Sequence, residues 1–282
     1  MPKSDLLKDI LAESPNRRSL LKKLSLASAA TGAMLTSGGL KLSADPASPT
    51  PTDIVQFALN LEYLESEFYS IATTGKYISE LGIGTSGSGA SGPTTGGKQV
   101  TFSDFLHAAY VAYELGEKER AHVTLLRSAL SSAGVTPIAK PEIDLDAAGI
   151  GFSDENSFLL LSRMFEDVGL SAYAGAAQLP SFASSPYLPT AARIIAQEAE
   201  NVAIVRIAIA SIGLPTKQMD GVDIIPPPSG RLYTSTNDNG LCELRTPGQV
   251  LYLVYGNKQN ATSGGFFPNG VNGVLRTSSG PA

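Results

Sequence analysis

Apolar residues recur every three or four positions along four long stretches of the chain, a spacing that predicts amphipathic helices. These helices are expected from about Thr52 to Thr74, from Ser103 to before Gly134, from a Ser153 N-cap to before Pro180, and from Thr190 to before Gly213. Helices of this size are about 30–45 Å long. The pattern therefore predicts an all-α protein built on a four-helix bundle, with a longer connection between the second and third helices.

The segments outside these helices have a different composition. Residues 82–98, GIGTSGSGASGPTTGGK, are rich in glycine and serine, which predicts a flexible connection. Residues 214–282 are rich in Pro, Gly, Asn and Tyr, which predicts a largely irregular extension. One short helix is expected there, with Thr246 as its N-cap and Gln249 completing a capping box. At least one of the adjacent rings of residues 266–267, both Phe, is expected to pack against the bundle.

The N-terminal region carries the pattern of an export signal. Residues 16–22, NRRSLLK, precede an uncharged stretch from Leu24 to Leu40 that is rich in Ala, Ser, Gly and Leu. The pair Arg17 and Arg18 resembles the twin-arginine signal, although two other positions of that motif differ. A general secretory signal is the alternative. We expect cleavage after Ala44, export by the twin-arginine machinery, and a periplasmic or secreted product.

Charge and cysteine content narrow the possible functions. Without residues 1–44 the chain keeps 14 Lys and Arg against 23 Asp and Glu, a net charge of −9. An acidic protein of this kind is a poor binder of nucleic acid. No apolar run of spanning length remains after the signal, so no stable membrane span is expected. The single cysteine, Cys242, excludes an intramolecular disulfide and a cysteine-rich metal site.

The sequence thus predicts four parts. They are a signal peptide at 1–44, a short Pro- and Ser-containing linker at 45–51, a four-helix domain at 52–213, and a C-terminal extension at 214–282 that packs on the bundle.

One of the two histidines lies next to a carboxylate in the second predicted helix. Glu119 and His122 are three residues apart, so they point to the same face. Ala112, Leu115 and Leu126 continue that face, which predicts that it is buried. A buried carboxylate and imidazole need partners, because an unpaired charge in a core is costly. A metal ion is one such partner, and a hydrogen-bonded pair without metal is the alternative.

Each of the other three helices offers a carboxylate of its own. In the first helix Glu62 precedes Tyr69 by seven residues, and in the third helix Glu166 precedes Tyr173 by the same number. Seven residues are two turns, so each pair lies on nearly one face. This repeat selects Glu62 and Glu166 over their acidic neighbours. In the fourth helix Glu198 lies on an apolar face.

At these positions the chain resembles the ferritin-like superfamily, and more closely the bacterial ferritin-like proteins grouped with desiccation-associated proteins. The resemblance rests on FALNLEYLESEFY, ELGEKERAHVTLL, FEDVGLSAYAGAA and IAQEAENVAIVR, and it covers roughly residues 52–275. It implies an antiparallel four-helix bundle with iron or manganese at its centre. The implied metal ligands are Glu62, Glu119, His122, Glu166 and Glu198.

The chain departs from the family pattern at one ligand. Asn201 stands three residues after Glu198, where the pattern has a second histidine. A neutral amide is a weaker ligand for iron or manganese than an imidazole. We therefore expect that one metal position is weakened or lost.

Two functions from different classes remain. The first is an exported protein that binds iron or manganese and acts in oxidative or desiccation stress, by oxidising Fe(II) or removing peroxide. The alternative is a metal-poor extracytoplasmic structural or stress protein that keeps the bundle without a working di-metal centre. Asn201 favours the alternative, whereas Glu119 and His122 oppose it. Iron storage in a closed shell is a third function with less support, since the Gly-rich segment and the long extension would obstruct a cage.

Overall fold

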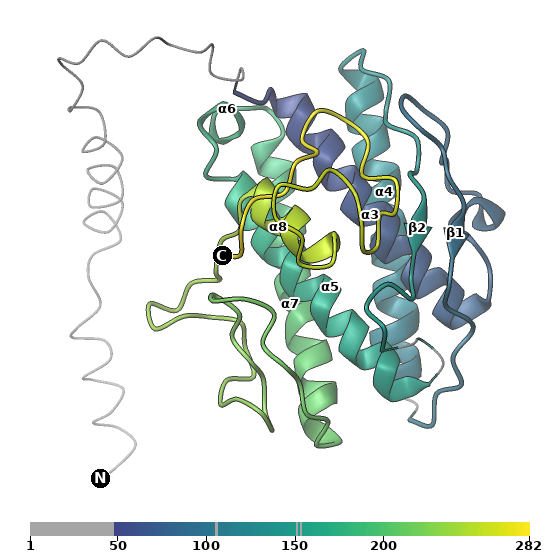
Figure 1. The fold of residues 1–282 in the computed structure, drawn as a ribbon, viewed down its shortest axis with the longest axis vertical. Coiled ribbons are helices and arrows are strands. Elements are labelled where there is room, and N and C mark those ends of the chain that lie inside the picture. The colour runs from purple at the N-terminus through teal and green to yellow at the C-terminus, as the bar shows by residue number, and fades with distance from the viewer. Residues whose placement is uncertain (1–47, 105–106, 151, 153) are drawn as a thin grey trace. The chain divides into compact units, whose positions relative to one another are not determined.

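Four long helices dominate the protein (Figure 1). The computed structural model describes residues 48–282 except 105–106, 151 and 153, so the expected signal at 1–44 lies outside the described residues. The long helices are α3 (Pro51–Thr74), α4 (Leu115–Ser132), α5 (Glu155–Ala176) and α7 (Leu188–Ser211). A π-helical segment, η2 (His107–Glu114), leads directly into α4. The expectation of an all-α fold is confirmed, since the described strands contain only two residues each.

The helix starts differ from the expected ones by a few residues, for local reasons. Helix α3 begins at Pro51 because Thr50 is the N-cap, and its side chain accepts a hydrogen bond from the Asp53 backbone N–H at 3.2 Å. Helix α5 is capped by Asp154, whose Oδ1 accepts from the Ser157 N–H at 3.0 Å. The expected cap one residue earlier, Ser153, lies outside the described residues.

The other two starts also need correction. The second helix is helical from His107 among the described residues, whereas Ser103 lies in a bend before it. Helix α7 begins at Leu188, two residues before Thr190, with Pro189 in its first turn. A four-residue helix, α6 (Pro180–Ala183), occupies the connection before α7 and was not predicted.

The glycine-rich segment has a defined path, which corrects the expectation of a flexible connection. It follows a 3₁₀ turn, η1 (Ile78–Leu81), contains strand β1 (Thr94–Thr95), and runs beside the chain that contains strand β2 (Ile143–Asp144). The two strands pair in parallel. At Gly87 a Cβ atom would lie 2.0 Å from the carbonyl oxygen of Pro137. Glycine here permits two backbones to approach closely.

The helices are held together by a core that is rich in aromatic rings. Helix α3 packs against α4 and α5, and α5 packs against α7. The ring of Phe68 on α3 lies 5.1 Å from that of Phe158 and 5.0 Å from that of Phe165, both on α5. Full burial of such a ring contributes about 1.5–3 kcal/mol. These contacts fix the spacing of α3 and α5, the two helices that carry the Glu and Tyr repeat.

The C-terminal region contains the short helix expected there. Helix α8 (Pro247–Val254) has Thr246 as its N-cap, with the capping box completed by Gln249. Phe266 and Phe267 are both buried, as expected from their side chains. The ring of Phe266 packs edge-on against Phe165 of α5, with 5.0 Å between ring centroids. Both ends of this contact belong to the same compact unit, residues 48–282.

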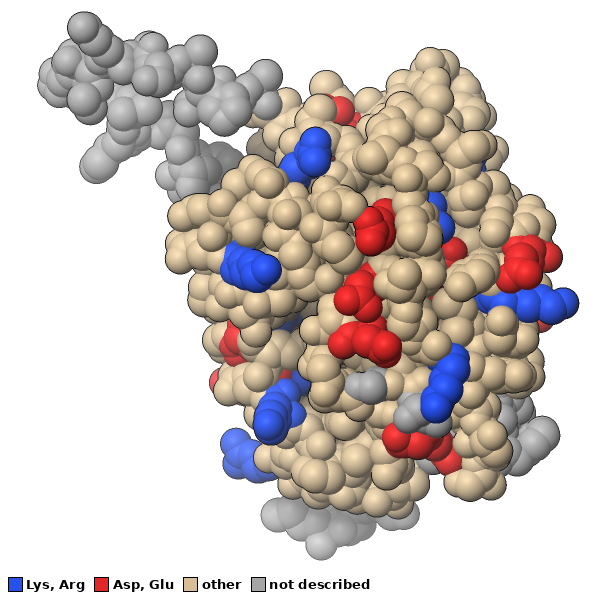
Figure 2. All heavy atoms as spheres, turned by 45° about the vertical axis from the view of Figure 1, so that its right-hand side comes forward, with Lys and Arg blue, Asp and Glu red and all other residues tan. Residues whose placement is uncertain are grey.

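A group of acidic side chains lies in the interior of the protein. On the face shown in Figure 2, charged groups of both signs are scattered over a mostly uncharged surface. By contrast, seven acidic residues are at most 6% exposed: Glu62, Glu65, Glu67, Glu119, Glu166, Asp167 and Glu198. Buried carboxylates require compensating charge or protons. Within the described part of the chain, no helix combines the length and apolar character needed to cross a bilayer.

Candidate metal centre

Four of the predicted ligands converge in the core from three helices. Glu62 comes from α3, Glu119 and His122 from α4, and Glu198 from α7, and one ligand atom of each lies within 4.8 Å of the others. Nδ1 of His122 is 3.2 Å from Glu119 Oε2, 3.3 Å from Glu62 Oε2 and 3.5 Å from Glu198 Oε1. A single nitrogen thus faces three carboxylate oxygens, and His122 is only 8% exposed.

Two tyrosines link the glutamates of α3 and α5. The Tyr173 hydroxyl donates to Oε1 of Glu62, and the Tyr69 hydroxyl donates to Oε1 of Glu166. Each tyrosine of the repeat therefore reaches the glutamate of the opposite helix. The second oxygens, Oε2 of Glu62 and of Glu166, have no hydrogen-bond partner among the described residues. Oε2 of Glu62 instead faces Nδ1 of His122 at 3.3 Å, and both buried oxygens lie where a cation would stabilise them.

Glu166, the fifth predicted ligand, is fully buried beside the other four. It is not one of the group whose ligand atoms lie within 4.8 Å of one another. Burial raises the pKa of Glu166 well above its usual range, and the charge of Glu119 adds to the effect, while the hydrogen bond from Tyr69 opposes it. Glu166 thus belongs to the electrostatic cluster but lies outside the four-residue group.

Asn201 occupies the position where a second histidine was expected. It is fully buried, and its Nδ2 donates to Oε1 of Glu119 at 3.0 Å. Its Oδ1 accepts from Nε2 of Gln197, one turn earlier on α7, which fixes the orientation of the amide. Asn201 therefore directs an N–H group, rather than a lone pair, at the carboxylate of Glu119. The donor set on this side does not fit a second metal ion.

Glu65 is a member of the cluster that was not predicted from the sequence. Its pKa is raised well above the usual range by burial first, and then by the charges of Glu198, Glu119, Glu62 and Glu166. Across from it on α5, a Cβ atom at Gly169 would lie 3.0 Å from Glu65 Oε1 and 3.2 Å from Glu198 Oε2. The glycine makes room for both carboxylates. The signal was present in the spacing, since residue 65 follows residue 62 by one turn.

Bound protons reduce the negative charge of the cluster when no metal is bound. Burial raises the pKa of Glu119 to about 7, with the hydrogen bond from His122 opposing and the charge of Glu62 adding to the rise. Burial by itself lowers the pKa of His122, but Glu62 and Glu119 outweigh it and raise that pKa to about 12. Burial and the charges of Glu119 and Glu166 raise the pKa of Glu198. A proton on Nδ1 of His122 thus competes with a metal ion for one place.

The metal-free protein is expected to lose thermal stability as the pH rises from about 5 to 9. Folded Glu119, with a pKa of about 7 against an ordinary value of 4.5, keeps a proton that the unfolded chain has released. Folded His122, with a pKa of about 12 against an ordinary 6.5, does the same at higher pH. Because the native state holds more protons, rising pH favours unfolding. Thermal melts in chelator should fall by about 10 °C across this range.

Two variants of α4 test which groups cause this fall in melting temperature with pH. Glu119→Gln removes one of the titrating groups and should flatten the dependence of the melting temperature on pH. Glu117→Gln changes an exposed carboxylate two residues away, and its melting temperature should depend on pH as that of the wild type does. A melting temperature that rises with pH in the metal-free wild type would contradict the assignment.

The distances from His122 to the three carboxylates match those around one divalent ion. A tetrahedral ion with bonds of about 2.0–2.2 Å to nitrogen and oxygen holds its ligand atoms about 3.3–3.6 Å apart. The three distances from His122 Nδ1 to oxygen are 3.2–3.5 Å. Glu62 Oε2 and both oxygens of Glu198 have no hydrogen-bond partner within the described residues. Mixed carboxylate and imidazole donors suit iron or manganese.

An all-helical protein with a buried cluster of carboxylates and one histidine is the class that these observations define. Residues 50–211 match the family model of the ferritin-like domain. This match covers more than half of the chain, and the chain therefore belongs to the ferritin-like domain family. It runs from the N-cap of α3 to the end of α7 and includes every residue of the candidate centre. A comparison with curated proteins gives no match.

Proposed function

We propose that this protein binds one iron or manganese ion in the core of an antiparallel four-helix bundle and acts after export in oxidative or desiccation stress. The observation that carries the proposal is the convergence of three carboxylate oxygens on Nδ1 of His122. In the metal-free state this nitrogen holds the proton that offsets their charge. A divalent ion at the same place would neutralise more of that charge than a proton can.

The tyrosine contacts support the antiparallel arrangement. Glu62 meets Tyr173, and Tyr69 meets Glu166. Advancing by seven residues along α3 therefore means moving back by seven residues along α5. Two helices with this pattern of contacts run in opposite directions.

The chain's own residues have separable roles in the proposed centre. Glu62, Glu119, His122 and Glu198 would hold the ion, which supplies one-electron chemistry toward dioxygen or peroxide when bound. Nδ1 of His122 must lose its proton before it can bind metal, so binding should release protons. The hydroxyl of Tyr173 orients Glu62 so that Oε2 faces the histidine. Such orienting contacts typically change metal affinity about 10- to 100-fold.

Metal analysis of the wild-type protein tests the proposal directly. Protein purified without chelator and dialysed against Fe(II) or Mn(II) should retain about one ion per chain. At a free metal concentration of 100 times the dissociation constant, binding adds about 2.7 kcal/mol to stability. That corresponds to a rise of roughly 5–10 °C in the melting temperature. Retention of no metal, with unchanged melts, would contradict the proposal.

The alternative function is a structural protein without metal. The hydrogen bonds of Asn201 to Glu119 and of Tyr69 to Glu166 favour it, because they satisfy part of the cluster without any ion. The same metal analysis separates the two functions. The structural function requires that the apo protein be as stable at neutral pH as the protein incubated with metal.

We propose in addition that the protein leaves the cytoplasm through the twin-arginine pathway. The supporting feature is the pair Arg17 and Arg18 before a weakly hydrophobic stretch. The double variant Arg17→Lys plus Arg18→Lys is expected to strand the precursor in the cytoplasm, as followed by cell fractionation. Lys22→Arg in the same segment keeps the charge and the pair, and should be exported normally. Normal export of the double variant would count against this pathway.

A further inference from the structure

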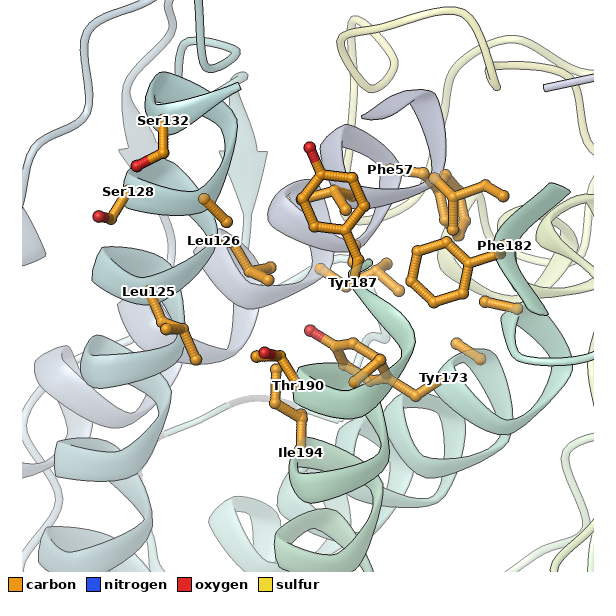
Figure 3. Close-up of a pocket in the computed structure, with 18 residues that line it drawn as sticks. Phe57, Leu125, Leu126, Ser128, Ser132, Tyr173, Phe182, Tyr187, Thr190 and Ile194 are labelled. Carbon is orange, nitrogen blue, oxygen red and sulfur yellow. The ribbon is translucent and has the colours of Figure 1, made fainter. Parts of the chain in front are cut away.

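An apolar cavity of about 190 Å³ lies between the helices near the candidate metal centre (Figure 3). Every long helix and the short α6 contribute to its wall. Representative side chains are Phe57 of α3, Leu126 of α4, Tyr173 of α5, Phe182 of α6 and Ile194 of α7. None of the lining residues carries a charge. The cavity is therefore an apolar space beside a highly charged cluster.

The cavity lies about one helical turn away from the predicted metal ligands, along the helix axes. Ala58, Leu126 and Ile194 line it, and each is four residues from a predicted ligand on its own helix. Four residues correspond to about 6 Å along a helix axis. Tyr173 belongs to both sites, because its ring lines the cavity while its hydroxyl donates to Glu62. The Tyr173 side chain thus contacts both the cavity and the candidate metal centre.

The cavity has an entrance with polar groups. Leu125 lines it and is 42% exposed, which places the opening beside α4. The hydroxyl-bearing side chains of Ser128, Tyr187 and Thr190 also line it, and each is at least partly exposed. Figure 3 shows Thr190 and Tyr187 beside the ring of Tyr173. A ligand inside would meet apolar groups in the interior and hydroxyls near the surface.

We propose that this cavity binds a small neutral molecule with one aromatic ring or a short aliphatic chain, in a position next to the proposed metal centre. An apolar cavity of about 150 Å³ holds benzene, so the volume here suits one ring with a small substituent. A charged ligand would be desolvated without an ionic partner, which is costly. Binding in the cavity needs no metal, whereas a coupling between this binding and the metal centre rests on the proposed function.

Binding of toluene to the metal-free protein tests the cavity. Toluene should raise the melting temperature in a concentration-dependent way and bind with a negative heat-capacity change. Benzoate has a similar size but carries a charge, and it should do neither. Ala129→Phe places a ring in the cavity from α4 and should weaken toluene binding by about tenfold or more. Thr190→Phe provides a second filling variant from α7 if the first is unstable.

The matched control is Ser131→Phe, an exposed neighbour on α4 that does not line the cavity. It should bind toluene as the wild type does. Equal binding of toluene by Ala129→Phe, Thr190→Phe and the wild type would overturn the proposed cavity site. So would equal binding of toluene and benzoate.

The link between the cavity and the centre needs a separate readout. With Co(II) as a spectroscopic probe, saturating toluene should change the visible absorption of the bound ion, because Tyr173 contacts both the cavity and Glu62. Toluene binding with an unchanged Co(II) spectrum would overturn the coupling between the cavity and the centre. Toluene binding by a protein that takes up no Co(II), Fe(II) or Mn(II) would refute the metal function, and the coupling with it, while supporting the cavity as a binding site.

Discussion

Replacing His122 with alanine is expected to lower the affinity for Fe(II) or Mn(II) by roughly 1000-fold or more, which is about 4 kcal/mol of binding free energy. His122 supplies the only nitrogen in the group of four ligands. Its removal leaves Glu62, Glu119 and Glu198 close together without an imidazole between them. These carboxylates would then hold protons rather than metal. Competition with a chromogenic chelator measures the affinity.

Controls on the same helix separate ligand loss from a damaged fold. His122→Gln keeps a side chain of similar length but without an imidazole, and it should lose affinity nearly as much as alanine. Glu117→Ala removes an exposed carboxylate and should leave the affinity within about threefold of wild type. Far-ultraviolet circular dichroism should remain unchanged in all three. Wild-type affinity in His122→Ala would remove His122 from the centre.

The part of the site that could be predicted from sequence depends on local geometry. Glu119 and His122 are three residues apart, and a helix of any packing brings such residues to one face. The seven-residue spacing from Glu62 to Tyr69, repeated on α5, pointed to Glu62 and Glu166. It did not separate them from their acidic neighbours by burial, since Glu65, Glu67 and Asp167 are buried as well. The structure adds that each tyrosine contacts the glutamate of the other helix. Helical periodicity alone does not specify such contacts between helices.

The features that were missed depend on tertiary partners. Glu65 was passed over because an acidic residue on a helix is usually exposed, yet it is buried where Gly169 of α5 leaves room. Residues 82–98 were expected to be flexible because of their composition. They follow a defined path because glycine allows them to lie against residues 137–146, as at Gly87. In each case the deciding partner is distant in sequence.

The centre has two halves built from equivalent positions but with different chemistry. On one side His122 of α4 faces Glu62 and Glu198. On the other side Asn201 of α7 donates to Glu119. The imidazole can exchange its proton for a metal ion, whereas the amide cannot give up its N–H at physiological pH. This difference between His122 and Asn201 is why we expect one metal position rather than two.

Asn201→His is expected to raise the metal content from about one ion per chain to about two. The imidazole introduced at position 201 would replace the amide that now donates to Glu119. It would lie near Glu166, whose Oε2 has no hydrogen-bond partner among the described residues. Together with Glu119 and Glu166, this imidazole would hold the second ion. Elemental analysis gives the stoichiometry, and electron paramagnetic resonance of the Mn(II) form would show coupling between neighbouring ions.

The double variant His122→Asn plus Asn201→His supplies the matched control, because it exchanges the two side chains. It should again bind about one ion, now on the side of Glu166, and its Mn(II) spectrum should lack the coupling seen in Asn201→His. The single variant His122→Asn should bind none tightly, since both sides then carry amides. Two tightly bound ions in the wild type, or one in Asn201→His, would show that Asn201 does not limit the centre. Two bound ions in Asn201→His, together with one bound ion in the exchanged variant, would establish that each imidazole specifies one metal position.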